Sequence, residues 1–332
     1  MTAERNPELA RAALDGLSAY EQAERPAPIP PRPEIARLGP ARLRDHGGTG
    51  PLAILIPSLI NPPHILDLDA EVSLAGAIAG MGRHALLLDW GEARDRADLT
   101  VAGHVEQLLL PLLSDLGEPA ALIGYCLGGT MAIAAANLAP PFNLAIERVA
   151  TLAAPWRFAA YPAPGRASLL GMWRHSQTAA QSLGALPMEV LQAAFWSLDP
   201  ERTVTKFARF AALDPASSNA RRFVVLEDWA NEGEPLPCPA AAELMEDFFG
   251  ADRPGSGGWS IAGTAITDRP MTDRVPVPSL HFTAARDRIT PAAAAPAGDT
   301  VEIASGHVGM IVGSARAALH AGLKGFLDPS CR

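Results

Sequence analysis

A cysteine stands between two glycines in the segment G-Y-C-L-G, residues 124–128. This spacing is that of the G-x-S-x-G nucleophile elbow, with a thiol in place of the serine hydroxyl. The nucleophile of an elbow lies at the apex of a tight strand-to-helix turn, so its backbone is strained and its neighbours two positions away must lack bulk. Gly124 and Gly128 meet this need, and Gly129 lets the helix lie close to the sheet. The pattern predicts a nucleophilic Cys126, whose thiolate the following helix dipole would favour.

The uncharged stretch around this segment admits two other interpretations. No charged residue lies between Glu118 and Glu147, which is long enough for a membrane-spanning helix. Pro119, Asn137 and three glycines within the stretch favour a strand, a turn and a helix instead. Cys126 could also be a buried small apolar side chain, as most free cysteines are.

A nucleophilic cysteine needs a base for its proton and an acid that orients the base. In elbow-type hydrolases the chain order is nucleophile, acid, base, each in a loop after a strand. The apolar run S-L-H-F-T-A-A is followed by a loop with Asp287, and the run T-V-E-I-A by S-G-H-V-G with His307. Because parallel strands end at the same edge of a sheet, Asp287 and His307 are predicted to converge with Cys126.

The acid and the base each have rivals in the sequence. His307 is preferred among eight histidines because glycines flank it in a loop after a late strand. Asp287 precedes a proline turn and could be a turn former. Asp89, Asp273 and Asp299 are alternative acids, although Asp89 at a strand end is more consistent with a structural role.

Attack on a thioester forms an oxyanion, which needs backbone N–H donors. The N–H of Leu127, next to the nucleophile, is the first predicted donor. The second is predicted in the loop P-S-L-I-N after the first strong strand, from Leu59 or Ile60.

The elements that must position these residues follow from apolar runs and helical periodicity. Several runs lack polar alternation, as parallel strands covered on both faces do. Strands are predicted at 52–57, 84–90, 120–125, 148–154, 279–285 and 300–304. Helices are predicted at 68–81, 100–116, 127–138 and 312–327. This alternation predicts an α/β protein with a mostly parallel, doubly wound sheet.

The regular alternation stops in the middle of the chain. Residues 156–275 hold helical patterns near 187–198, 202–213, 216–231 and 239–249 with no convincing strand between them. Because the strand pattern resumes afterwards, we interpret 156–275 as a helical cap inserted after the sixth strand, rather than a separate domain. The core is then 51–155 with 276–330, preceded over 1–50 by a short helix and an extended, proline-rich arm.

Composition narrows the class of protein. A chain of 332 residues that is 48% hydrophobic and 19% charged fits one large globular domain. The net charge of −9 and the lack of a basic run argue against nucleic-acid binding. Three widely spaced cysteines predict neither a disulfide framework nor a metal site, and fit a reducing cytoplasm. The first ten residues lack the features of a secretory signal, and no transmembrane segment is expected.

Together, these segments resemble the polyhydroxyalkanoate synthases over about residues 51–327. G-Y-C-L-G-G joined to the earlier I-L-D-L (65–68) is the specific part of the match, which L-L-L-D-W, A-A-R-D-R-I-T-P and S-G-H-V-G support. The resemblance implies an α/β-hydrolase fold, with the family's catalytic cysteine, aspartate and histidine at Cys126, Asp287 and His307. The sequence departs from the family in two places. The cap matches the family poorly, and Ala102-Gly103-His104 stands where the family has D-D-Y.

The resemblance implies an acyltransferase that takes 3-hydroxyacyl-CoA or a related thioester, forms an acyl-cysteine and passes the acyl group to a hydroxyl. It needs no cofactor, because coenzyme A is only the leaving group, and it leaves open which residues hold CoA. The family's short synthases need a partner subunit, so either such a subunit or a homodimer is compatible. We expect a cytoplasmic protein, and the surface of a polyester granule is one location that this expectation includes.

Two alternatives to a synthase stay open. An intracellular α/β hydrolase, cleaving thioesters or polyesters with the same Cys-His-Asp triad, would differ by letting water reach the acyl-cysteine. A non-catalytic granule-surface or scaffolding protein that keeps the fold is the other, and the intact triad argues against it.

Overall fold

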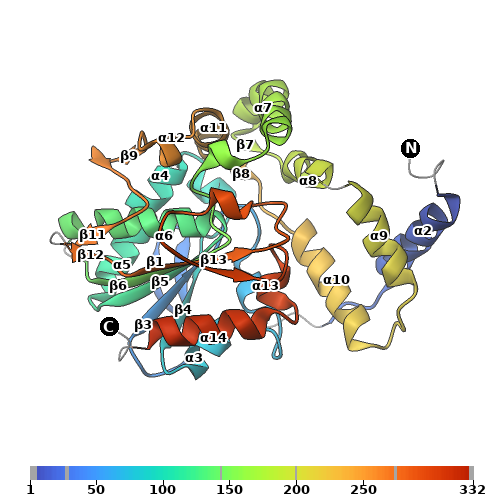
Figure 1. Cartoon of the computed structure of the whole chain (residues 1–332), viewed down its shortest axis with the longest axis horizontal. Helices are drawn as coiled ribbons and strands as arrows, with labels where there is room; N and C mark the ends of the chain where they lie inside the picture. The colour runs from blue at the N-terminus through green and yellow to red at the C-terminus, as the bar shows by residue number, and fades with distance from the viewer. Residues whose placement is uncertain (1–5, 27–29, 143, 199, 273–274, 329–332) are drawn as a thin grey trace.

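The computed structural model describes residues 6–26, 30–142, 144–198, 200–272 and 275–328. Within them, one eight-stranded sheet has the order β1-β2-β4-β3-β5-β6-β13-β14 (Figure 1). The strands from β4 to β14 are parallel, and β2 joins β4 antiparallel. The strands are β1 (Glu34–Leu38), β2 (Ala41–Asp45), β3 (Leu52–Ile56), β4 (His84–Asp89), β5 (Ala120–Tyr125), β6 (Ile146–Leu152), β13 (Ser279–Ala284) and β14 (Asp299–Ile303).

Helices cover both faces of this sheet (Figure 1). They are α3 (Leu74–Gly80), α4 (Val101–His104), which continues through a π-helical segment into α5 (Leu110–Leu116), α6 (Leu127–Leu138), α13 (Gly309–Val312) and α14 (Arg316–Leu327). Short 3-10 turns lie at Pro63–Leu66, Ala93–Arg96, Pro140–Phe142, Phe158–Ala160 and Ala292–Ala294. The predicted doubly wound, mostly parallel sheet is confirmed.

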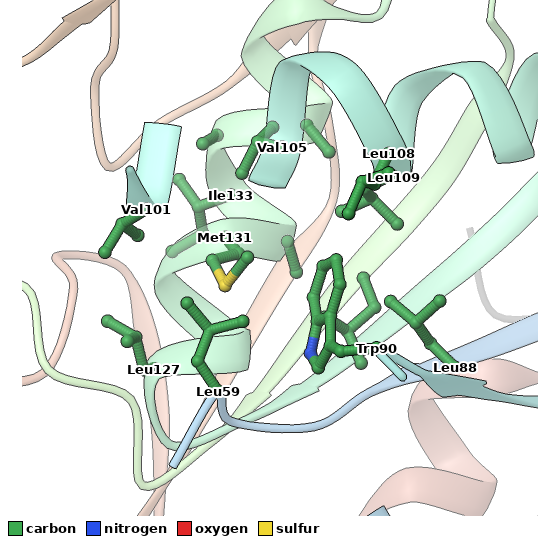
Figure 2. Close-up of a cluster of buried hydrophobic side chains, with 14 of the residues drawn as sticks. Leu59, Leu88, Trp90, Val101, Val105, Leu108, Leu109, Leu127, Met131 and Ile133 are labelled. Atoms are coloured by element: carbon green, nitrogen blue, oxygen red, sulfur yellow. The ribbon is translucent and has the colours of Figure 1, made fainter. Parts of the chain in front are cut away.

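Two apolar cores lie between the sheet and the helices that cover its two faces. Alternate residues of β3 point to opposite faces, so Ile54 belongs to the core under α4, α5 and α6, whereas Leu55 belongs to the core over α3 and α14. Every residue of β3 and β5 is buried, which explains why their sequences lack polar alternation. Figure 2 shows the first core, where Leu59 and Trp90 lie among side chains of α6 and of the helical segment from Val101.

The prediction of an extended arm up to residue 50 is wrong for residues 34–45. These residues form the hairpin β1–β2, which extends the sheet at one edge. Gly39 has φ +55° at the turn, a conformation that favours glycine. Leu43 is buried, whereas Arg44 on the other face binds Asp89 of β4 at 3.0 Å. The alternation in A-R-L-R-D was the signal, and the proline-rich composition before it hid the strand pair.

The helical cap is inserted between β6 and β13, after the sixth strand of the sheet, as predicted. Its main helices are α7 (Ala163–Leu183), α8 (Met188–Leu198), α9 (Pro200–Ala211), α10 (Ser218–Asn231) and α11 (Cys238–Ala242), which runs on as a π-helix over Glu243–Gly250; α12 (Arg253–Ser256) is a single turn. The sequence prediction missed α7, whose many small residues weaken its periodicity. It also missed the two-residue strands of this region: β7 (Ala185–Leu186), β8 (Leu236–Pro237), β9 (Ser260–Ile261), β10 (Thr264–Ala265), β11 (Met271–Thr272) and β12 (Val275–Pro276).

The helix expected near the start of the chain is α2 (Pro7–Gln22), and it packs against the cap rather than the sheet (Figure 1). A Cβ added to Gly16 would lie 1.9 Å from the carbonyl oxygen of Phe207, so α2 and α9 cross in backbone contact. A small apolar cluster joins α2, α9 and α10; its members are Tyr20, Ala23, Phe210, Leu213, Ala220, Phe223 and Val224. No helix among the described residues is both long enough and apolar enough to span a membrane.

Candidate active site

Cys126 stands at the sharp turn between β5 and α6. Its backbone has φ +54° and ψ −130°, one of few positive φ angles among the described non-glycine residues. The neighbouring strand β6 stabilises this strained conformation, because the Cys126 N–H donates to the Leu152 carbonyl at 2.9 Å. Its own carbonyl accepts from the Gly129 N–H at 2.8 Å. The side chain is half-buried at the positive end of α6, the conformation expected of an elbow nucleophile.

The three glycines around Cys126 are required by close backbone contacts. A Cβ at Gly124 would lie 2.4 Å from the Gly128 carbonyl oxygen, and one at Gly128 would lie 2.1 Å from the Ile56 carbonyl oxygen. A Cβ at Gly129 would lie 2.4 Å from the Cβ of Ala154. No larger side chain fits at these positions without moving backbone.

His307 and Asp287 are in direct contact. The Nδ1 of His307 lies 2.7 Å from Oδ2 of Asp287, whose side chain is fully buried. The other carboxylate oxygen accepts from the N–H groups of Ile289 and Thr290, both at 2.8 Å. The acid loop after β13 thus fixes the carboxylate, and the carboxylate fixes the orientation of the imidazole, leaving Nε2 as its other polar atom.

The environment of His307 favours its charged form. Burial opposes charge on the ring, but a negative Cys126, the hydrogen bond to Asp287 and a hydrogen bond with Cys126 together raise the pKa of His307 to about 10. The ring of Tyr125 lies beside the imidazole, with centroids 5.1 Å apart. While Cys126 is ionised, the arrangement therefore supports a thiolate–imidazolium pair.

The predicted oxyanion donors belong to the start of α6 and to the loop after β3. The N–H groups of Leu127 and Leu59 have no hydrogen-bond acceptor among the residues that the structure describes. The N–H of Ile60 instead donates to the Ser58 hydroxyl at 3.3 Å. The side chains of Leu59 and Leu127 belong to the same buried core (Figure 2). Their role as donors stays a prediction.

A cavity of about 310 Å³ lies over Cys126 and His307. The loop after β3 lines one side with Ser58, Ile60 and Asn61. The cap lines the other side with apolar and charged side chains: Met188, Gln192, Thr203, Lys206, Leu226, Glu227 and Trp229. The cavity is therefore a cleft between the core and the cap, of a size that suits a small ligand.

The rival residues lie away from this cavity where the structure describes them. Asp89 binds Arg44 at the sheet edge, which is the structural role expected of it. Asp299 is exposed at the start of β14, and Cys238 begins α11 without lining the cavity. Asp273 and Cys331 lie outside the described residues.

The cap residues of the cavity were not predicted from sequence. Lys206 and Glu227 form an ion pair of 2.5 Å in the cavity wall, and Trp229 is buried beside the loop after β3. The segment D-W-A-N-E-G (228–233), which resembles a segment of the synthase family, was the one available signal, but nothing in it shows that Trp229 lines the same cavity as Cys126.

Solved structures with similar folds include an epoxide hydrolase and a lipase. An epoxide hydrolase A from Mycobacterium thermoresistibile aligns with 90% of this chain and 98% of its own, at a TM-score of 0.50 and 18% identity. A lipase in its open form aligns with 88% and 95%, at a TM-score of 0.52 and 13% identity. The chain has the α/β-hydrolase fold. At these identities the likeness concerns the fold alone.

Curated relatives carry a common name. The poly(3-hydroxyalkanoate) polymerase subunits PhaC of Haloferax mediterranei and Haloarcula marismortui are each 26% identical over 282 residues, 79% of this chain. The chain spans only 55% and 57% of their lengths. The subunit of Allochromatium vinosum is 24% identical over 78% of this chain and 75% of its own. No family model matches the chain. The resemblance to polyhydroxyalkanoate synthases is thus confirmed at modest identity.

Proposed function

We propose that this chain is an acyltransferase of the polyhydroxyalkanoate synthase type, which acts on 3-hydroxyacyl-CoA through an acyl-cysteine. The observation that carries the proposal is the placement of Cys126, at a strained apex, in one cavity with His307, whose ring Asp287 orients. The polymerase names of the relatives support the choice of substrate.

In the first step the Cys126 thiolate attacks the thioester carbonyl, and the N–H groups of Leu127 and Leu59 stabilise the oxyanion. The intermediate collapses when the bond to the CoA sulfur breaks. The leaving thiolate takes the proton of the His307 imidazolium, so the products are an acyl-cysteine, a neutral imidazole and free CoA.

Acylation itself prepares His307 for the second step. Once Cys126 carries an acyl group, its negative charge is gone and one main cause of the raised pKa of His307 disappears. The ring can then accept the proton of an acceptor hydroxyl, whose oxygen attacks the acyl-cysteine. An ester forms, the thiolate leaves, and the thiolate–imidazolium pair is restored.

The test is incubation of the purified protein with 3-hydroxybutyryl-CoA, with CoA followed by liquid chromatography and polymer by gel permeation. Cys126→Ala should abolish CoA release, and Cys238→Ala is the matched control because Cys238 lies outside the cavity. Mass spectrometry after brief exposure should locate the acyl group on Cys126. CoA release that survives in Cys126→Ala would contradict the proposal.

Hydrolysis by the same triad is the second candidate. The ion pair between Lys206 and Glu227 lies in the cavity wall, and the two side chains are 28% and 13% exposed, so water reaches this wall. Water could then replace the acceptor hydroxyl at the acyl-cysteine. In the same incubation, CoA release with free 3-hydroxybutyrate and no polymer would support the hydrolase and reject the synthase.

A further inference from the structure

The loop between β3 and the turn at Pro63 is fastened at both ends by tryptophan side chains. The indole N–H of Trp90 donates to the carbonyl of Pro57 at 3.1 Å. The indole N–H of Trp229 donates to the carbonyl of Pro62 at 2.9 Å. Trp90 follows β4 in the core, whereas Trp229 belongs to α10 in the cap. The two bonds thus reach the loop from the core on one side and from the cap on the other.

The loop segment between these anchors faces the active site. Ser58, Ile60 and Asn61 line the catalytic cavity, and the N–H of Leu59, between them in the chain, has no acceptor among the described residues. The Leu59 side chain is 2% exposed and packs near Trp90 and Leu127 (Figure 2). A displacement of either anchored carbonyl would move this N–H relative to Cys126.

Both tryptophans are buried, at 3% and 6% exposure, and the loop carbonyl is the hydrogen-bond partner of each indole N–H. The cap side has a further contact with the loop, because a Cβ at Gly233, just after α10, would lie 3.0 Å from the Ile60 carbonyl oxygen. α10 is itself tied to α2, since Tyr20 donates to Asp228 at 2.6 Å and Arg25 pairs with the same carboxylate. The helix that carries Trp229, α10, is therefore also fixed by its contacts with the N-terminal helix.

We propose that Trp90 and Trp229 are positioning residues that hold residues 58–61 in the geometry required for acyl transfer. Trp229 belongs to the cap and donates to the Pro62 carbonyl of the loop. The geometry of the loop therefore depends on the position of the cap. The catalytic part of this inference rests on the proposed function. The hydrogen bonds of Trp90 and Trp229 affect the rate of acyl transfer because the loop N–H acts as an oxyanion donor.

The cap offers a matched control. Trp259 is 3% exposed, and its indole N–H donates to the Glu243 carboxylate at 2.9 Å. It does not line the catalytic cavity. Trp259→Phe therefore removes an indole hydrogen bond from an equally buried site in the same region, without touching the loop after β3.

The experiment compares Trp229→Phe, Trp90→Phe and Trp259→Phe in the full chain. Phenylalanine keeps most of the ring packing and removes the N–H. For Trp229→Phe and Trp90→Phe we expect about tenfold lower kcat for CoA release, with the KM for 3-hydroxybutyryl-CoA unchanged within about twofold. We also expect faster hydrogen–deuterium exchange of the amides at 58–61. Trp259→Phe should change neither quantity.

Two results would overturn the proposal. In the first, Trp229→Phe and Trp90→Phe keep the wild-type kcat or the wild-type exchange at 58–61. In the second, Trp259→Phe lowers kcat as much as the other two, which would make the effect one of general stability. If the wild type releases no CoA from any acyl-CoA, the proposed function fails. The hydrogen–deuterium exchange at 58–61 then decides alone whether the tryptophans hold the loop.

Discussion

His307 and Asp287 are joined by a hydrogen bond of 2.7 Å although the whole of β14 lies between them in the chain. β13 and β14 are parallel neighbours, so the loops that follow them leave the sheet side by side. The same edge carries the turn after β5, which brings Cys126 into one cavity with His307. The register of three parallel strands, rather than any local motif, sets the geometry of the triad.

Replacing Asp287 by Asn should remove most of the activity. The amide would offer an N–H to Nδ1 of His307, which favours the wrong tautomer of the ring. We expect the rate of CoA release to fall by a factor of about 10⁴. Asp299→Asn is the control, because Asp299 is an exposed carboxylate only twelve positions along the chain. Equal rates in the two variants would contradict the assignment of the acid.

The pKa of His307 should depend on Cys126. Burial opposes the charged ring, and the negative sulfur is a main cause that raises the pKa to about 10. In Cys126→Ala that cause is absent, so the pKa of His307 should fall and the ring should lose its proton at lower pH. NMR titration of labelled histidine measures the shift, with Cys238→Ala as the control. An unchanged pKa in Cys126→Ala would contradict the ion-pair interpretation.

Gly128→Ala should destabilise the fold. Its Cβ would lie 2.1 Å from the Ile56 carbonyl oxygen, which belongs to the end of a fully buried strand. We expect the free energy of unfolding to fall by about 2 kcal/mol or more, measured by urea denaturation. Gly171→Ala is the matched control in α7, because its nearest neighbour is the flexible end of Arg174 at 3.8 Å. There alanine should raise the stability by up to about 1 kcal/mol.

Stability should fall in mild acid because of His104. Its side chain is buried, with Nδ1–H donating to the Thr100 carbonyl and Nε2 accepting from Arg96. Burial lowers the pKa of His104 to about 4 against an ordinary 6.5. Between these values the unfolded chain binds the proton and the folded chain does not. The free energy of unfolding should therefore decrease as pH falls from 6.5 to 4, by up to about 1.4 kcal/mol per pH unit.

His104→Gln should reduce this dependence on pH, because it removes the titrating ring. His175→Gln, at an exposed position of α7, should leave the dependence unchanged. Urea denaturation at several pH values gives both slopes. A slope for His104→Gln equal to that of the wild type would show that other groups cause the loss in acid.

Local patterns were enough to predict six of the eight strands of the sheet and the three loops that carry Cys126, Asp287 and His307. Cys126, Asp287 and His307 each follow an apolar run and carry turn residues, so strand ends could be read from composition. The hairpin at 34–45 was missed because its two strands are short and follow a proline-rich segment. Its pairing with β4 is a long-range contact that no local pattern reveals.

The cap side of the cavity could not be predicted for a different reason. Trp229 and Lys206 lie on separate helices, and only the packing of α9 and α10 over the loop after β3 brings them to the cavity. In sequence, an aromatic or charged residue on an amphipathic helix is equally consistent with a core or a solvent position. The hydrogen bond from Trp229 to Pro62 depends on the insertion point of the cap, which is a property of the whole topology.

The small apolar cluster that joins α2, α9 and α10 is a satellite of the two cores of the sheet. Phe210 and Phe223 stack within it at 4.3 Å, yet the cluster is separate from both cores of the sheet. Such a satellite can open and close without melting the strands beneath it. Because Trp229 of the same α10 belongs to the core over α3 and α14, we expect α2 and α9 to detach from this wall of the cleft before α10 leaves the sheet.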